Sequence, residues 1–90
     1  MGATMAGMAP TGPIVIRSGN QRTVAGERVA VSGTLPVQEH DGTVRDRSLI
    51  RTPHGRTEVF EGDEIELGGV RFVVAIDVAA PSITLTPVVP

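Results

Sequence analysis

Apolar and polar residues alternate along most of the chain, and a period of two residues is typical of β-strands with one buried face. The clearest run predicts a long central strand over residues 70–78, with five apolar side chains on one face: Val70, Phe72, Val74, Ile76 and Val78. Shorter runs start at residues 14, 29, 44, 65 and 83, and Val59 marks another. Glycine-containing turns separate these runs about every ten residues. The pattern predicts an all-β fold, a single small β-barrel or sandwich of about 6–8 short antiparallel strands.

Two segments of the chain resemble each other. Residues 19–31 and 62–74, offset by 43 positions, both read Gly-Asn/Asp, three residues, Val/Leu, one residue, Gly, one residue, Arg, apolar, one residue, Val. Each segment predicts a turn, a short strand, a glycine reversal and a core strand. One interpretation is an internal two-fold duplication whose halves pack about a pseudo-two-fold axis and close a barrel. The alternative is that two hairpins with glycine turns look alike by chance.

The composition supports the strand prediction and excludes several classes of function. Val, Ile and Thr contribute 28 of the 90 residues, the chain has no lysine, and Phe60 and Phe72 are its only aromatic residues. The absence of cysteine excludes disulfides, thiolate zinc sites and cysteine nucleophiles. A net charge of −2 provides no general attraction for a phosphate backbone, so we expect no nucleic-acid partner.

The first 13 residues differ in composition from the rest of the chain. Residues 1–13 carry no charge and are rich in Gly, Pro and Met, which predicts a flexible N-terminal arm before a single domain at residues 14–90. The arm lacks the apolar run of a signal peptide, and no stretch approaches the about 20 apolar residues of a membrane span. We therefore expect no membrane contact, and a location in the cytoplasm or within an assembled particle. Because so short a chain buries a small core, we expect association with other proteins or with copies of itself, to which Met5 and Met8 contribute apolar contacts.

Few side chains suit catalysis or metal binding. His40 and His54 stand near turn glycines and are expected to be solvated loop residues, and no cluster predicts a metal or another cofactor. No serine lies in a Gly-x-Ser-x-Gly elbow, and the glycine-rich phosphate loops are absent. We therefore expect neither an enzyme nor a small-molecule binder. An enzyme would need a deep pocket that brings His40 or His54 together with a carboxylate.

Charge is divided along the chain near Thr57. Residues 42–56 are dominated by four arginines, and residues 58–66 contain five carboxylates, the first of which is Glu58. The candidate interaction residues in these two segments are Arg45, Arg47, Arg51 and Arg56, followed by Glu61, Asp63, Glu64 and Glu66. One hypothesis is that these strands lie side by side and form cross-strand pairs worth about 0.2–1 kcal/mol each. The other is that the basic segment of one copy meets the acidic segment of another.

Residues 59–74 also resemble the end of a forkhead-associated domain, because Gly62-Asp63, Ile65 and Leu67-Gly68 precede an apolar strand. That resemblance implies a phosphopeptide-binding module, in which arginines such as Arg17, Arg22 or Arg28 would surround a phosphate. The same order of turns and strands is similar to small β-barrel connector and completion proteins of tailed bacteriophages and to small β-proteins of high-GC bacteria. This second resemblance implies a structural subunit, for instance of a virion. Our first expectation is a non-enzymatic structural or protein–protein interaction module.

Overall fold

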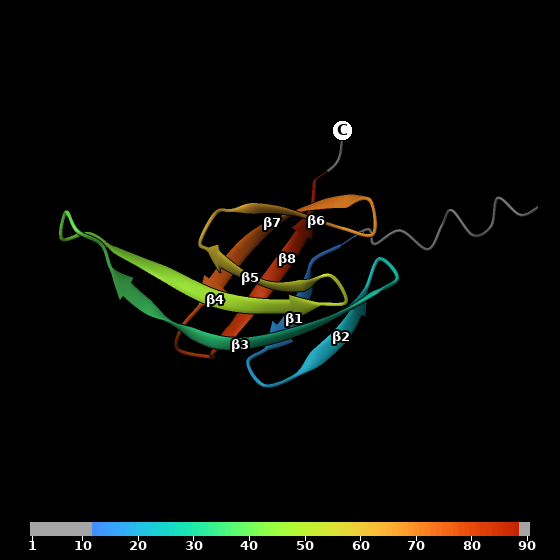
Figure 1. Cartoon of the computed structure of the whole chain (residues 1–90), viewed down its shortest axis with the longest axis horizontal. Helices are drawn as coiled ribbons and strands as arrows, with labels where there is room; N and C mark the ends of the chain where they lie inside the picture. The colour runs from blue at the N-terminus through green and yellow to red at the C-terminus, as the bar shows by residue number, and fades with distance from the viewer. Residues whose placement is uncertain (1–11, 89–90) are drawn as a thin grey trace, which may run out of the picture.

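The computed structural model describes residues 12–88, which form eight β-strands and no helix. The strands make two four-stranded antiparallel sheets, in the orders β1-β8-β7-β6 and β2-β3-β4-β5 (Figure 1). Their bounds are β1 Ile14–Arg17, β2 Gln21–Val24, β3 Glu27–Gln38, β4 Val44–Thr52, β5 Gly55–Phe60, β6 Glu64–Leu67, β7 Val70–Asp77 and β8 Ser82–Pro87. The predicted all-β fold is confirmed. No helix in the described part of the chain is long and apolar enough to cross a membrane.

The two sheets pack face to face as a sandwich. The backbone ladders end at β1 and β6 in one sheet and at β2 and β5 in the other, and within residues 12–88 no ladder joins the sheets. On the β1/β2 side a side chain makes the link instead, because Arg22 Nη1 donates a hydrogen bond to the Val15 carbonyl oxygen at 3.2 Å. The barrel alternative is therefore wrong, since a barrel needs a continuous ladder around its circumference.

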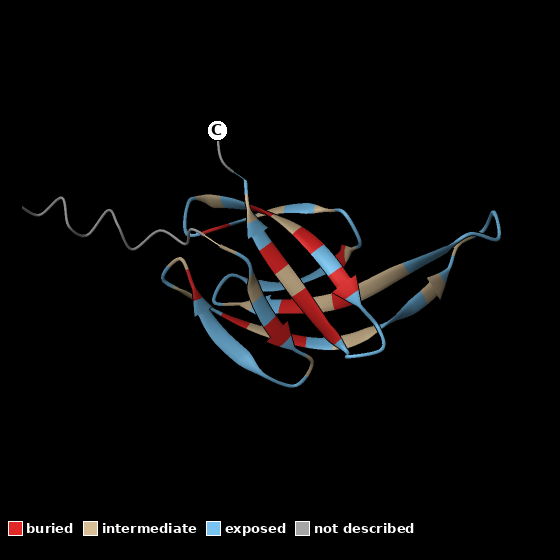
Figure 2. Ribbon diagram, turned by 180° about the vertical axis from the view of Figure 1, so that it is seen from behind, coloured by how far each residue is buried: buried red, intermediate tan, exposed pale blue. Residues whose placement is uncertain are grey.

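The core lies between the inner faces of the two sheets, and buried residues alternate with less buried ones along the strands (Figure 2). Phe72, the largest buried side chain, is fully inaccessible to solvent. Burying a side chain of this kind stabilises the fold by about 1.5–3 kcal/mol. Twelve apolar residues form the core: Ile16, Val24, Val29, Val31, Ile50, Val59, Leu67, Phe72, Val74, Ile76, Ile83 and Leu85.

The strand predicted at residues 70–78 is present as β7, in the interior of its sheet. It ends one residue earlier than the apolar pattern predicts. The Asp77 carboxylate accepts hydrogen bonds from the amides of Ala79 and Ala80, which turns the chain away and leaves Val78 37% exposed outside the strand. The longest strand is instead β3, with 12 residues.

The two halves of the chain are related by a pseudo-two-fold arrangement. Strands β1 to β4 correspond in order to β5 to β8, so the strand order of one sheet maps onto that of the other. The correspondence extends to single hydrogen bonds: Gly19 N donates to the Val31 carbonyl at 2.7 Å, and Gly62 N donates to the Val74 carbonyl at 2.8 Å. The similarity of residues 19–31 and 62–74 is thus a similarity of structure, although the barrel expected to follow from it is not formed.

The turns that end β2 and β6 meet where the two halves touch. Ala25 and Gly68 occupy corresponding positions and both adopt a left-handed backbone, with φ values of 50° and 57°. A Cβ atom at Gly68 would lie 3.0 Å from the Ala25 carbonyl carbon and would overlap the carbonyl oxygen. Glycine is therefore required at residue 68 both by backbone conformation and by close approach.

The halves differ most between their third and fourth strands. In the second half four residues, 78–81, connect β7 to β8, whereas β3 and β4 continue pairing from Leu35–Arg47 to Gln38–Val44 beyond an irregularity near Gly33. Residues 35–46, which we call the ribbon, project from the sandwich as a two-stranded hairpin (Figure 1). The described structure measures 54 × 27 × 23 Å. Its radius of gyration of 13.9 Å exceeds the about 11–12 Å of a compact chain of this length, as an extended hairpin requires.

Candidate functional site

The four arginines singled out by the sequence share the outer face of the β2-β3-β4-β5 sheet, because each alternates with inward-facing neighbours along β4 or β5. Two of them have partners within the same chain. Arg47 Nη1 lies 2.8 Å from Glu58 Oε2, and the Arg45 guanidinium carbon lies 4.3 Å from the centre of the Phe60 ring. Arg45 also approaches Asp63 at 4.0 Å. For Arg45 and Arg47 the geometry therefore matches the intramolecular hypothesis.

The predicted carboxylates lie in the turn after β5 and along β6. Glu61 Oε1 accepts a hydrogen bond from Ile76 N at 2.6 Å, and Asp63 Oδ2 accepts one from Phe60 N at 2.9 Å. These two side chains therefore hold the turn in place. Glu64 and Glu66 are exposed on the outer face of β6, and Glu64 lies 3.6 Å from an Arg71 nitrogen. Met5 and Met8 lie outside the described residues.

Arg51 and Arg56 are in a different situation. They are direct cross-strand neighbours on β4 and β5, both are exposed, and neither has an ion pair within residues 12–88. Two like charges placed directly opposite each other destabilise a sheet. Both line a hollow of about 400 Å³ on the outer face, and Arg28 lines an adjoining hollow with Arg51. Arg51 and Arg56 thus form an uncompensated like-charge pair on the sheet.

Sequence reasoning grouped all four arginines and did not separate Arg51 and Arg56. The signal was available, because Pro53-His54 forms a two-residue loop and residues symmetric about such a loop pair directly. The register across that loop therefore places Arg51 opposite Arg56.

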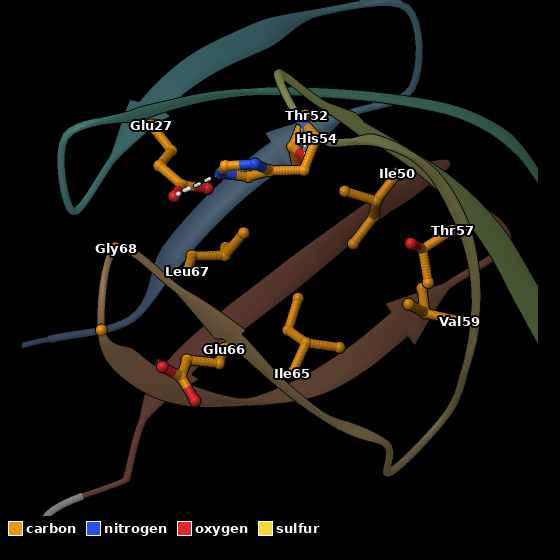
Figure 3. A pocket seen from close by; sticks show the side chains of 11 residues that line it. Glu27, Ile50, Thr52, His54, Thr57, Val59, Ile65, Glu66, Leu67 and Gly68 are labelled. Atoms are coloured by element: carbon orange, nitrogen blue, oxygen red, sulfur yellow. Dashed lines mark hydrogen bonds and ion pairs between the residues drawn. The ribbon is translucent and has the colours of Figure 1, made fainter.

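A second feature, not expected from the sequence, lies between the edge strands β5 and β6. It is an open cavity of about 360 Å³ with an apolar wall and a polar rim (Figure 3), and we call it the β5/β6 cavity. The wall is formed by Ile50, Val59, Ile65 and Leu67. At the rim His54 Nε2 lies 3.1 Å from Glu27 Oε2, with the His54 side chain 76% exposed and that of Glu27 22% exposed.

The cavity thus brings one of the two predicted histidines together with a carboxylate. His40 lies elsewhere, exposed in the turn at the end of the ribbon. Nucleophilic catalysis also needs a hydroxyl oriented by the base, and among the described residues no hydroxyl hydrogen-bonds to the His54 ring. The nearest contact of that kind uses the backbone, because Thr52 Oγ1 accepts a hydrogen bond from His54 N at 3.1 Å. Within residues 12–88 no group of three or more metal-ligating side chains comes together.

No family model, no curated protein and no solved structure matches the chain.

Proposed function

We propose that this protein is a non-enzymatic interaction module, a structural subunit that assembles with copies of itself or with other proteins through the β3–β4 ribbon. The observation that carries the proposal is the ribbon itself. A two-stranded hairpin in water is marginally stable, and residues 35–46 extend beyond the sheet that would cover them. Binding to a partner would supply the missing second layer.

The exposed side chains of the ribbon suit such a contact. Val44 is 63% exposed and Leu35 is 42% exposed, which makes them two of the most accessible large apolar residues among residues 12–88. The second half of the chain forms a similar set of strands with only a four-residue turn at the corresponding place. A similar arrangement of strands therefore forms without such an extension, which supports a role in assembly for the part of the ribbon beyond Arg45 and Asp46, the two residues that contact the turn after β5.

The unpaired arginines suggest how copies would be oriented. Arg51 and Arg56 would gain opposite charges if their face met the exposed Glu64 and Glu66 on β6 of another copy. Such contacts fix orientation and weaken as salt is added.

The alternative, a phosphopeptide-binding module of the forkhead-associated type, has less support. Its candidate arginines are dispersed: Arg17 and Arg28 lie on the outer faces of different sheets, and Arg22 bonds to the Val15 carbonyl at the edge between them. A phosphate is best held by donors that converge.

The test is to replace residues 35–46 by Val78-Ala79-Ala80-Pro81, the connection that the second half uses. We expect this trimmed variant to keep its fold, with a lower thermal stability because the contacts of Arg45 with Phe60 and of Asp46 with Glu61 are lost. We expect it to lose association, measured by light scattering at low and high salt. The matched control is the double variant Gln38→Ser/His40→Ser, which changes the ribbon tip without shortening it. A full-length chain that stays monomeric in both salts, or a trimmed variant that associates as well as the full chain, would contradict the proposal.

A further inference from the structure

The β5/β6 cavity exists because the two halves of the sandwich differ at three inward-facing positions. On the opposite side, the corresponding gap between β1 and β2 contains Ile14, Val70 and Arg22. Ile14 and Val70 pack against the core there, and Arg22 bonds to the backbone of β1. The corresponding residues at the cavity are Thr57, Glu27 and Ile65. The chain's own side chains bridge the gap between β1 and β2, whereas the gap between β5 and β6 is an open cavity.

The open gap combines an apolar wall with two carboxylates, the exposed Glu66 on β6 and Glu27 on β3. Ile65 and Leu67 on β6 face Ile50 on β4 across the cavity (Figure 3). Glu27 stands at one rim and is mostly buried, with 22% of its side chain exposed. An occupant that matches both features has an apolar stem and a positively charged end, because a partly buried carboxylate gains most from a cation.

Glu27 also limits the shape of that cation. Its Oε2 atom already lies 3.1 Å from His54 Nε2, which leaves Oε1 for another partner. A guanidinium binds best when it engages both oxygens of a carboxylate, whereas an ammonium group is a compact point charge that can use one oxygen. The geometry therefore favours an ammonium over a guanidinium.

We infer that the β5/β6 cavity binds a lysine side chain of a partner protein, with the methylene stem against Ile65 and Leu67 and the ammonium group donating to Glu27 Oε1. The partner is a different protein, because this chain contains no lysine. The inference deepens the proposed function, since it names a partner chemistry for an interaction module, but it uses a different surface from the ribbon.

The direct test is a titration of the full chain with N-acetyl-lysine-N-methylamide, followed through the methyl NMR signals of Val59, Ile65 and Leu67. We expect saturable shifts at those methyls. The norleucine analogue, which has a comparable apolar chain without the charge, should bind at least about tenfold more weakly, a difference of about 1.4 kcal/mol. The arginine analogue should bind more weakly than lysine. No saturable shift with lysine, or equal binding of lysine and norleucine, would overturn the inference.

Two variants test the site itself. Thr57→Ile places in the cavity the residue that fills the opposite gap and should abolish the methyl shifts, while the same substitution on an outer face, Thr86→Ile, should leave them intact. Glu27→Gln keeps the shape but removes the charge, and it should bring lysine binding down to the level of norleucine. Lysine binding that persists unchanged in Thr57→Ile or in Glu27→Gln would contradict the assignment.

His54→Ala tests the argument about the second oxygen. The variant frees Glu27 Oε2, so the affinity for the arginine analogue should rise relative to that for lysine. An unchanged ratio of the two affinities would refute the single-oxygen geometry.

Repeating the lysine titration with the trimmed ribbon variant distinguishes the cavity proposal from the ribbon proposal. Loss of association with lysine binding retained supports the cavity and leaves the ribbon proposal intact, whereas binding lost together with association places the lysine contact on the assembled ribbon and overturns the cavity site.

Discussion

Replacing Gly68 by alanine should destabilise the protein more than any other single methyl group added at a turn glycine. Gly68 has a φ of 57°, and a Cβ atom there would lie 3.0 Å from the Ala25 carbonyl carbon and overlap the carbonyl oxygen. The left-handed backbone costs a non-glycine residue about 1–2 kcal/mol. The collision is with backbone rather than with a flexible side chain, so the two turns must separate, and forced overpacking of this kind costs about 1–3 kcal/mol. We expect a total of about 2–5 kcal/mol.

Gly69 provides the matched control. Its φ of 82° is also positive, but a Cβ there has no other atom within 4 Å. Gly69→Ala therefore carries the backbone cost of about 1–2 kcal/mol without the collision. The difference between the two variants isolates the contact between the two halves of the sandwich.

Thermal unfolding followed by circular dichroism measures both variants. For a domain of this size each kcal/mol corresponds to about 4–8 °C in Tm, so Gly68→Ala should unfold at least about 8 °C below the native chain. Gly69→Ala should lose clearly less. Equal losses in the two variants would show that the turns of β2 and β6 do not meet as described, and the reasoning about the pseudo-two-fold contact would be refuted.

Three further outcomes are expected. Ser48→Ala removes a buried hydroxyl that makes two hydrogen bonds, so the free energy of unfolding should fall by about 1–3 kcal/mol, visible as a lower urea midpoint at unchanged slope; an unchanged midpoint would contradict it. Arg56→Glu replaces a like-charge pair with Arg51 by an opposite-charge pair, so stability should rise by up to about 1 kcal/mol and the gain should shrink in high salt; a gain that is independent of salt would argue against the pairing. Hydrogen bonds from the Thr43 hydroxyl and amide lower the pKa of the Asp41 carboxyl. The stabilisation that Asp41 gives to the ribbon turn is therefore present above about pH 4 and is lost as pH falls through the lowered pKa. A carboxyl NMR titration with a midpoint at or above the ordinary aspartate value would refute this.

The sandwich was largely predictable because its strands follow a strict alternation and its turns contain glycine. The segment around Phe72 shows this directly, since every second residue from Val70 to Ile76 faces the core in the structure. The correspondence of residues 19–31 with 62–74 was also readable, because both segments need the same turn geometry.

The ribbon was not predictable in the same way. The alternation of β3 is interrupted near Gly33, where the register with β4 shifts, and Pro36 follows within the strand. Proline is rare inside strands except at edges and bulges, so Pro36 gives no sequence signal for a strand that continues past Gly33. Only the pairing with β4, which depends on residues more distant in the chain, makes these residues strands.

The β5/β6 cavity could not be predicted from the sequence for a different reason. A cavity forms where facing side chains are too short to contact each other. The alternation of apolar and polar residues does not show this, because it identifies Thr57 only as another position in a strand. The correspondence of residues 19–31 with 62–74 already aligns Glu27 with Val70, and extending it to the first strand aligns Thr57 with Ile14. Both differences make an inward position at the cavity smaller or polar.

Comparing the two halves of the sandwich distinguishes residues that pack the sheets in both halves from features that are present in one half only. Positions that are apolar and buried in both halves, such as Val31 with Val74 and Ile16 with Val59, are sufficient to explain the packing of the two sheets. The ribbon, the Arg51–Arg56 pair and the cavity rim at Glu27 have no counterpart in the other half of the described chain. Each of the three carries a cost for the isolated chain: an uncovered hairpin, a like-charge pair or an unfilled gap. A symmetric sandwich would avoid all three costs, and the contacts that we propose with other molecules would offset them.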